Sequence, residues 1–253
     1  MPKRLNILNS WVDDITKEEC LKKIEKFVKS SYSRRVHTIF ASNPEKIFSV
    51  PKHPLVYEEI KNADILLPDG IGVVLAVRFL YGIKISRLPG ADMMEEICKL
   101  AAKKGYKVFI YGAKEEVNKK AVDILIKRYQ GLNIVGRSHG YVKEKDMENL
   151  IEKINNSKAE ILFVALGSPR QEKWIAEYKN RLNTVKVCQG IGGTLDTIAG
   201  NVKRAPVFWQ KLNLEWFYRL LLEPKRIKRQ KVLPVFLFLI LKEKVRLVYA
   251  SKK

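Results

Sequence analysis

The chain has 253 residues, of which 46% are hydrophobic, and a formal net charge of +21 at pH 7. That is enough apolar material for one large α/β domain, with or without an appendage. The charge is uneven, because residues 201–253 carry 14 Lys or Arg against 3 Asp or Glu. A basic end of this kind indicates an anionic partner, either nucleic acid or a membrane surface.

Cysteine and histidine usage argues against a zinc site. Cys20, Cys98 and Cys188 are far apart, no CxxC pair is present, and the chain has only three His. The simplest interpretation is three reduced thiols in a cytosolic protein. We expect no signal peptide, and no apolar run reaches the ~20 residues needed to cross a bilayer.

Strand and helix patterns alternate along the chain. The sequence predicts strands at 4–9, 35–42, 64–68, 107–112, 133–137, 160–167 and 185–190. Between them it predicts a helix from the Thr16/Glu19 capping box to about 31, a helix at 55–63, a buried helix at 70–82 and further helices at 91–104, 114–129, 144–155 and 168–182. A short helix at 194–200 follows the last strand. This alternation predicts parallel strands with right-handed crossovers.

The predicted fold class is α/β: a Rossmann-like, mainly parallel sheet with helices on both faces, plus a helical C-terminal appendage. Continuous apolar strands such as ILFVAL, residues 161–166, indicate a sheet that is covered on both sides. We place the domain boundary after residue 203, with residues 204–253 as the appendage. Ligands of such sheets bind beyond the carboxyl ends of the strands, so the residues at those ends matter most.

The segment LLPDGIGVV, residues 66–74, places a carboxylate at one strand end. Asp-Gly between apolar runs usually signals a hairpin turn, but the second run suits a helix better than a returning strand. Asp69 is therefore either the N-cap of that helix or a carboxylate facing the crevice. In the crevice it would act as a general base or hold a sugar hydroxyl. The pattern alone leaves both alternatives open.

Asn43, with Glu45, follows the strand at 35–42. Ser42 or Asn43 would cap a helix that has Pro44 at its first position. The alternative is an amide that orients a substrate hydroxyl. Neither alternative is favoured by the residues themselves.

Several glycines also lie at strand ends: Gly112, Gly140, Gly167 and the loop GIGGTLD at 190–196, which contains Gly192. They either form tight turns or let the backbone approach a phosphate at a helix N-terminus. GIGGTL does not match the GxGxxG fingerprint, and the chain has no Walker A sequence. The absence of an Asp-x-Asp motif predicts that no metal holds a diphosphate here.

The stretch GSPRQEKWI, residues 167–175, places polar side chains in the first turn of a helix. Ser168 and Pro169 start a helix well, but Arg170 opposes the helix macrodipole at that position. Side chains of this turn would face the crevice, which favours a ligand role for Gln171.

The appendage is basic, aromatic and apolar by turns. We predict a helix at about 206–222, a break at Pro224 and a basic helix, followed by the apolar run at 232–241 and a basic end. Three arginines, Arg219, Arg226 and Arg229, either form a solvated face or contact an anion. Aromatic and basic residues together suit a membrane interface or nucleic acid. The ten-residue apolar run favours the membrane.

These motifs in this order resemble the WecG/TagA/CpsF family of bacterial glycosyltransferases. The matching stretches are ASNPEKIF, LLPDGIGVVLA, RLPGADMM, VFIYGAK, ALGSPRQEKWI, GIGGTLDTIAGNVKRAP and LEWFYRLLLEPKRIKR. The resemblance implies an inverting, metal-independent transferase without a cofactor. Such an enzyme moves an N-acetylmannosamine-type sugar from a UDP donor to N-acetylglucosamine on an undecaprenyl diphosphate lipid. The product feeds teichoic acid, enterobacterial common antigen or capsule synthesis.

The resemblance also implies roles for single residues. Asp69 looks like the catalytic base; Asn43, Arg87 and Gln171 match the sugar pocket, and Asp196 resembles a nucleotide contact. The appendage would dock peripherally on the cytoplasmic face of the cell membrane, where its three arginines would reach the diphosphates. The family often has Thr where this chain has Ala41, which leaves Ser42 as the hydroxyl source. A homo-oligomer stays open.

Two alternatives come from other functional classes. A basic nucleic-acid-binding protein predicts RNA or DNA binding with a steep salt dependence, but no RNA-recognition or helix-turn-helix motif is present, so nucleic acid is not the expected partner. A noncatalytic nucleotide-sugar sensor at the membrane predicts UDP-sugar binding that survives Asp69→Asn without any transfer. The Ala41 departure leaves room for the sensor.

Overall fold

The computed structural model describes residues 3–30, 35–222 and 227–250, and its centre is a six-stranded parallel sheet. The strand order is β4–β3–β8–β7–β5–β6. The strands are β3 (His37–Ser42), β4 (Ile65–Pro68), β5 (Lys107–Gly112), β6 (Asn133–Ser138), β7 (Ile161–Ala165) and β8 (Val187–Gly190). The predicted α/β class with a parallel sheet is confirmed.

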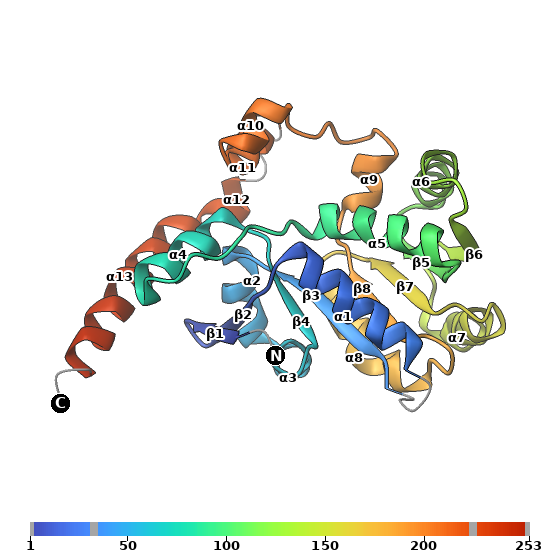
Figure 1. The fold of residues 1–253 in the computed structure, drawn as a ribbon, viewed down its shortest axis with the longest axis horizontal. Coiled ribbons are helices and arrows are strands. Elements are labelled where there is room, and N and C mark those ends of the chain that lie inside the picture. Colours follow the sequence, from blue (N-terminus) through green and yellow to red (C-terminus); the bar gives the residue numbers. More distant parts are fainter. Residues whose placement is uncertain (1–2, 31–34, 223–226, 251–253) are drawn as a thin grey trace.

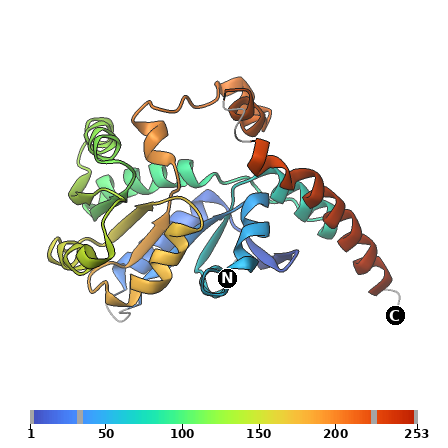
Figure 2. The same cartoon turned by 180° about the vertical axis from the view of Figure 1, so that it is seen from behind.

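Helices cover both faces of this sheet. One face carries α1 (Lys17–Lys29), α5 (Gly90–Lys104), α6 (Glu115–Arg128) and α9 (Thr194–Ile198), with α1 and α5 in front in Figure 1. The other face carries α3 (Pro54–Lys61), α7 (Met147–Asn156) and α8 (Arg170–Tyr178), which the reverse view in Figure 2 brings forward. Short 3-10 turns lie at Val50–Lys52, Glu144–Asp146 and Lys179–Arg181.

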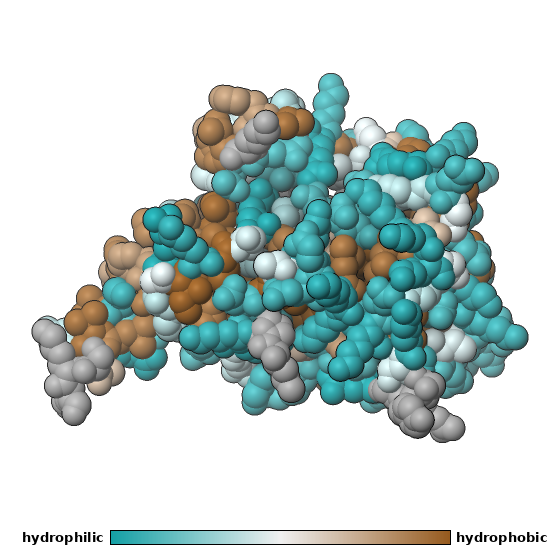
Figure 3. Space-filling view, in the orientation of Figure 1, coloured by the Kyte–Doolittle hydropathy of each residue, from teal (hydrophilic) through white to brown (hydrophobic). Residues whose placement is uncertain are grey.

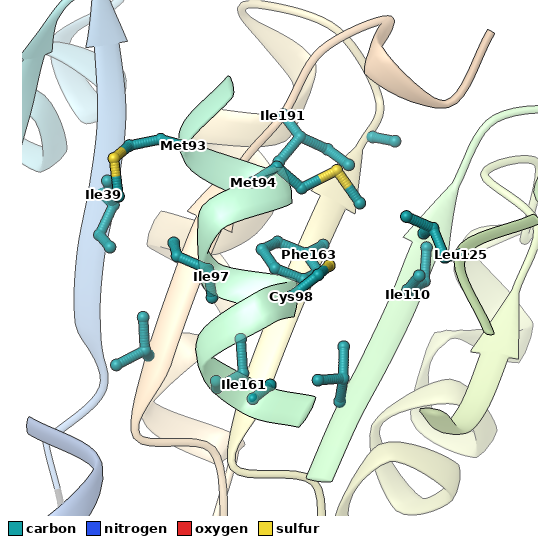
Figure 4. Packing of buried hydrophobic residues seen from close by; sticks show 14 of the residues in the cluster. Ile39, Met93, Met94, Ile97, Cys98, Ile110, Leu125, Ile161, Phe163 and Ile191 are labelled. Carbon is teal, nitrogen blue, oxygen red and sulfur yellow. The ribbon is translucent and has the colours of Figure 1, made fainter. Parts of the chain in front are cut away.

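The core explains why a central strand such as β7 is apolar without interruption. All five residues of β7 are buried, and alternate side chains enter opposite layers. Figure 4 shows the α5 layer, in which Met94, Ile97 and Cys98 lie over Phe163 and Ile110 of the sheet. Because β4, β5 and β7 are packed on both faces, they are almost entirely buried and apolar, whereas β6 has no buried residue.

Local signals fix the helix ends where the sequence predicts them. Thr16 caps α1, since the Glu19 N–H donates to its hydroxyl at 3.2 Å and the Glu19 carboxylate accepts the Thr16 N–H at 2.8 Å. Gly105 ends α5 in the left-handed conformation, at φ 72°. Both boundaries are confirmed.

The N-terminus differs from the single strand predicted at 4–9. It forms an antiparallel hairpin of β1 (Lys3–Ile7) and β2 (Ser10–Asp14). Leu8 and Asn9 make the two-residue turn with φ of 50° and 63°, the geometry that hairpin turns require. Asp13 then joins the hairpin to the sheet, because its carboxylate accepts from Arg4 at 2.7 Å and from the Leu66 N–H at 2.9 Å.

The helix predicted at 70–82 exists as α4 (Ile71–Tyr81), but it is buried on one face only. Its inner side chains, such as Val73 and Val77, pack on the hairpin and on α2 (Pro44–Ser49), whereas Leu75 and Phe79 are exposed. The predicted buried helix is thus buried on one face only, because an apolar run does not show which of its faces find a partner.

The end of the chain is divided more finely than predicted. The segment expected as one helix at 206–222 is two helices, α10 (Val207–Lys211) and α11 (Glu215–Leu222). Asn213 separates them in a left-handed turn, at φ 59°. After α12 (Ile227–Gln230), the apolar run and the basic end join in one 19-residue helix, α13 (Val232–Ala250).

Helix α13 packs lengthwise against α4 and α2, as both ribbon views show. Phe236 and Ile240 are its buried residues. The Phe236 ring meets Phe48 edge-on with centroids 6.5 Å apart. At the far end of α4, the Lys244 ammonium donates to the Leu80 carbonyl at 2.9 Å.

This packing predicts a contrast between two phenylalanines of α13. Phe236→Ala removes a side chain that is 6% exposed and should lower the free energy of unfolding by about 3 kcal/mol. Phe238→Ala, at a position that is 65% exposed, should change it by no more than about 0.5 kcal/mol. Urea denaturation of both variants measures the difference. Equal effects would contradict the seating of α13 through Phe236.

Candidate functional site

Asp69 lies where the carboxyl ends of two neighbouring strands meet. Ser42 of β3 is in register with Pro68 of β4, and the Asp69 N–H donates to the Ser42 carbonyl at 3.1 Å. Asp69 is not the cap of the following helix, because the N-cap of α4 is Gly70 and no side chain caps it. The capping alternative is therefore excluded.

The loop between α4 and α5 closes over Asp69 from the other side. The Leu88 N–H donates to the Pro68 carbonyl at 2.8 Å, which extends the chain alongside β4. The Arg87 Nε then donates to the Asp69 carbonyl at 2.7 Å. The backbone of Asp69 is thus held by β3 on one side and by Arg87 on the other, which leaves its side chain to face the charges around it.

The Asp69 carboxyl group is surrounded by charges of both signs. Burial raises its pKa, and the Glu215 carboxylate raises the pKa further. Arg87, Lys46 and the Gly90 N–H at the start of α5 favour the ionised form, yet they do not offset the burial. A carboxylate with a raised pKa accepts a proton more readily than an ordinary aspartate, which suits a general base.

The β3 end brings Ala41, Ser42 and Asn43 to the same place. Asn43 caps α2, because its side-chain oxygen accepts the Lys46 N–H at 3.0 Å. Its backbone and Cβ border Gly70, where an added Cβ would lie 3.1 Å from the Asn43 Cβ. Ala41 faces Gly90, where an added Cβ would lie 3.3 Å from the Cβ of Ala41. Ser42 is buried. Sugar binding by Ser42 and Asn43 stays a prediction.

Gln171 lies at the ends of β7 and β8 and is only 2% exposed. Its side-chain oxygen accepts the Gly192 N–H at 2.8 Å, and its amide donates to Glu172 at 3.0 Å. Both halves of the amide are therefore engaged within the protein. In this structure Gln171 fixes the loop after β8, and its predicted contact with substrate stays a prediction.

Glu172 and Lys46 form a buried ion pair behind Gln171. The Lys46 ammonium lies 2.7 Å from the carboxylate of Glu172, whose side chain is fully buried. Burial disfavours the charge of Glu172, but Lys46 and the Gln171 amide outweigh it and lower its pKa. Because Lys46 also acts on Asp69, this pair connects α8 with the carboxylate at the β4 end.

The glycines at the strand ends serve two different needs. Gly112 has φ 127° and an added Cβ would lie 2.4 Å from the Ala165 carbonyl oxygen, so only glycine fits between β5 and β7. Gly140 is also crowded, because an added Cβ there would lie 2.7 Å from the Leu166 side chain and 3.0 Å from the Gly112 Cα. Gly167 and Gly192 have positive φ with open space around the Cβ position. These two leave room for a ligand, and phosphate binding by any of the four stays a prediction.

The other predicted contacts fall near the C-terminal segment, which we define as residues 204–253. Asp196 is in the first turn of α9, and its backbone carbonyl accepts the N–H groups of Asn201 and Val202. The side chains of Arg219 and Arg229 and the whole of Arg226 lie outside the described residues. Roles for these four residues stay predictions.

A pocket of about 290 Å³ lies between the sheet domain and the C-terminal segment. Its lining includes two arginines, each paired with a carboxylate: Arg87 with Glu215 at 3.4 Å, and Arg204 with Asp92. The pocket adjoins the loop that holds Asp69, because Arg87 lines it and binds the Asp69 carbonyl. It is suited to an anionic group that would displace one carboxylate.

Sequence reasoning missed Lys46, Glu172, Arg204 and Glu215. Three of them look like ordinary surface charges in the sequence, and their partners are 112 to 128 residues away along the chain. Glu172 was noticed only as part of a polar first turn. No sequence pattern within a single segment predicts ion pairs between residues that are so far apart along the chain.

Two features are absent from the described part of the chain. Among those residues, no group of three or more His, Cys, Asp or Glu is placed to hold a metal ion. No helix among them is both long and apolar enough to cross a membrane. The three cysteines are buried and unpaired.

The fold and site define an α/β protein that binds its ligand at the carboxyl ends of a parallel sheet. Comparison with known proteins gives the family. Residues 5–249 match the model of the Glycosyl transferase WecG/TagA/CpsF family. The chain therefore belongs to this family and is a glycosyltransferase, as the motifs predicted.

Named relatives agree with this assignment. A Bacillus subtilis (strain 168) N-acetylglucosaminyldiphosphoundecaprenol N-acetyl-beta-D-mannosaminyltransferase is 40% identical over 79% of this chain and 77% of its own. Proteins of the same name from Staphylococcus aureus strains MRSA252 and NCTC 8325 are 35% and 34% identical, over 98% of this chain and 96% of theirs.

The raised pKa of Asp69 predicts that the native residue costs stability. In the folded protein Asp69 keeps its proton at pH values above its ordinary pKa of 3.8. The protein therefore loses stability as the pH rises from 3.8 to the raised pKa. Asp69→Asn should therefore raise the Tm at pH 7 by about 1–4 °C, and the gain should shrink below pH 4. Thermal unfolding at several pH values measures this.

Asp64→Asn is the matched control. Burial disfavours the charge of Asp64, but hydrogen bonds from His37 and from the Thr38 N–H outweigh it and lower its pKa. Its charge stabilises the fold at pH 7, so the same substitution should lower the Tm. A loss of Tm in Asp69→Asn at pH 7 would contradict the environment described here.

Proposed function

We propose that this protein transfers an N-acetylmannosamine-type sugar from a UDP donor to N-acetylglucosamine carried on undecaprenyl diphosphate. The relatives are named for N-acetyl-beta-D-mannosaminyl transfer to that acceptor, at 34–40% identity. The observation that carries the proposal is Asp69, a carboxylate with a raised pKa at the β4 end, next to a pocket lined by arginines.

Asp69 acts as the base of a single displacement. Its carboxylate takes the proton of the attacking acceptor hydroxyl while the new bond forms at C1 of the donor sugar. The bond from C1 to the diphosphate breaks, and UDP leaves with the electron pair. A donor whose diphosphate is α-linked would give the β-linked product of the relatives' names by this one inversion.

Charge that develops on the departing diphosphate needs donors fixed in advance. Arg87 and Arg204 line the pocket next to Asp69, and the Gly90 N–H, which begins α5, contacts the Asp69 carboxylate. The chain has no Asp-x-Asp motif for a metal, so we assign the diphosphate to arginines and propose transfer without a metal or cofactor. Arg219, Arg226 and Arg229 would join these arginines.

The acceptor is a lipid, and the C-terminal segment supplies a surface for the membrane. Apolar side chains are exposed on α4, on α10 and α11, and along α13, and they include Leu75, Phe79, Phe208, Trp216, Leu221, Leu237, Phe238, Leu241 and Val245. Figure 3 shows this hydrophobic surface running along α13 and α4. An exposed apolar surface of this extent in a basic segment suits peripheral docking on an anionic leaflet.

A transfer assay tests the activity. We expect wild type to transfer sugar from one member of a UDP-sugar panel to a lipid-diphosphate-linked N-acetylglucosamine acceptor. Asp69→Asn should lower kcat by about 100-fold or more while UDP binding persists. Asp123→Asn, at an exposed position of α6, is the control and should leave transfer unchanged. UDP-sugar binding without any transfer by wild type would instead indicate the sensor function.

Vesicle sedimentation tests the membrane surface. The protein should bind vesicles that contain phosphatidylglycerol, and added salt should weaken this binding. Phe238→Ser with Leu241→Ser should lower the affinity about tenfold. The control, Leu55→Ser with Ile126→Ser, removes two exposed apolar residues from α3 and α6. Equal loss in both double variants would contradict docking through α13.

A further inference from the structure

An acidic residue of the C-terminal segment reaches the catalytic loop. Glu215 begins α11, directly after the left-handed turn at Asn213, and is only 9% exposed. A carboxylate in the first turn of a helix is favoured by the helix dipole. The segment is otherwise strongly basic, and a described partner of this buried acid lies on the sheet domain.

That partner is Arg87. One terminal nitrogen of Arg87 lies 3.4 Å from the Glu215 carboxylate, while its Nε donates to the Asp69 carbonyl at 2.7 Å. Both side chains are largely buried and line the same pocket. One guanidinium therefore joins the C-terminal segment to the backbone of the proposed base.

The charges that act on Asp69 come from every element around it. Lys46 of α2 and Arg87 of the α4–α5 loop are the cations, and the Gly90 N–H of α5 also favours the carboxylate. The charge of Glu215 on α11 acts against them and favours the protonated form of Asp69. The C-terminal segment, although strongly basic overall, thus places a negative charge near Asp69.

We propose that Glu215 is a positioning residue, which seats the C-terminal segment on Arg87 and keeps Asp69 an effective base. This inference rests on the proposed function, in which Asp69 takes the proton of the acceptor. Without Glu215, the charge of Arg87 acts on Asp69 unopposed and the carboxylate becomes a weaker base. When the C-terminal segment docks on Arg87, it therefore keeps Asp69 an effective base and also brings its arginines to the site.

The pH dependence of transfer distinguishes this role from a structural one. In Glu215→Gln, Asp69 loses a proton at lower pH, so the acid limb of kcat/KM moves to lower pH while the plateau rate falls. At a pH on that limb, the variant should keep a roughly two- to tenfold larger fraction of its own plateau than wild type. Glu215→Asp should restore the wild-type limb in part.

Glu243→Gln is the matched control. It makes the same change of charge within the same segment, but Glu243 pairs with Arg246 on α13 at 2.7 Å. We expect its acid limb to coincide with that of wild type. A shift in this variant equal to that of Glu215→Gln would assign the effect to net charge alone and overturn the proposal.

A second measurement does not depend on activity. The ¹³C signal of the Asp69 carboxyl group, identified by its loss in Asp69→Asn, reports its titration directly. The midpoint should lie at lower pH in Glu215→Gln than in wild type. An unchanged midpoint, or a plateau that falls while the acid limb stays in place, would overturn the proposal. An inactive wild type would count against the proposed function only, and the NMR titration would still decide the role of Glu215.

Discussion

A single carboxylate placed among unequal charges is the constraint on which this site depends. Burial raises the pKa of Asp69, although the charges of Arg87 and Lys46 act to lower it. Neither cation is free to neutralise it, because Lys46 is paired with Glu172 and Arg87 with Glu215. Because Glu172 and Glu215 offset part of the positive charge of these cations, the pKa of Asp69 stays raised and its carboxylate accepts a proton more readily.

The sheet explains why these groups meet. Parallel strands bring their carboxyl ends to one edge, so residues from β3, β4, β7 and β8 converge although they are far apart along the chain. The buried network of Gln171, Glu172 and Lys46 then holds the loop after β8 and the start of α2 in one arrangement. Every member must stay paired, because an unpaired charge at such depth is strongly destabilising.

Local chemistry made much of this predictable from the sequence. The capping box at Thr16, the Asn43 cap with Pro44 and the Gly105 helix end are all decided by neighbours within four residues. Asp69 was recognisable because a carboxylate after an apolar strand must lie at the sheet edge.

The rest was hidden because it depends on distant partners. The β1–β2 hairpin needs Asp13 to reach Leu66, and the role of Glu215 needs Arg87, 128 residues earlier. The exposed face of α4 and the break at Asn213 are likewise set by tertiary packing. Helix α4 connects these contacts: its N-cap is Gly70, next to Asp69, and near its far end the Leu80 carbonyl accepts from Lys244 of α13. Because α13 is seated along α4 and α11 reaches Arg87, the C-terminal segment is held at two points that both lead to Asp69. Membrane docking of the segment, as we propose it, would therefore act on Asp69 through these two contacts as well as through the chain connection.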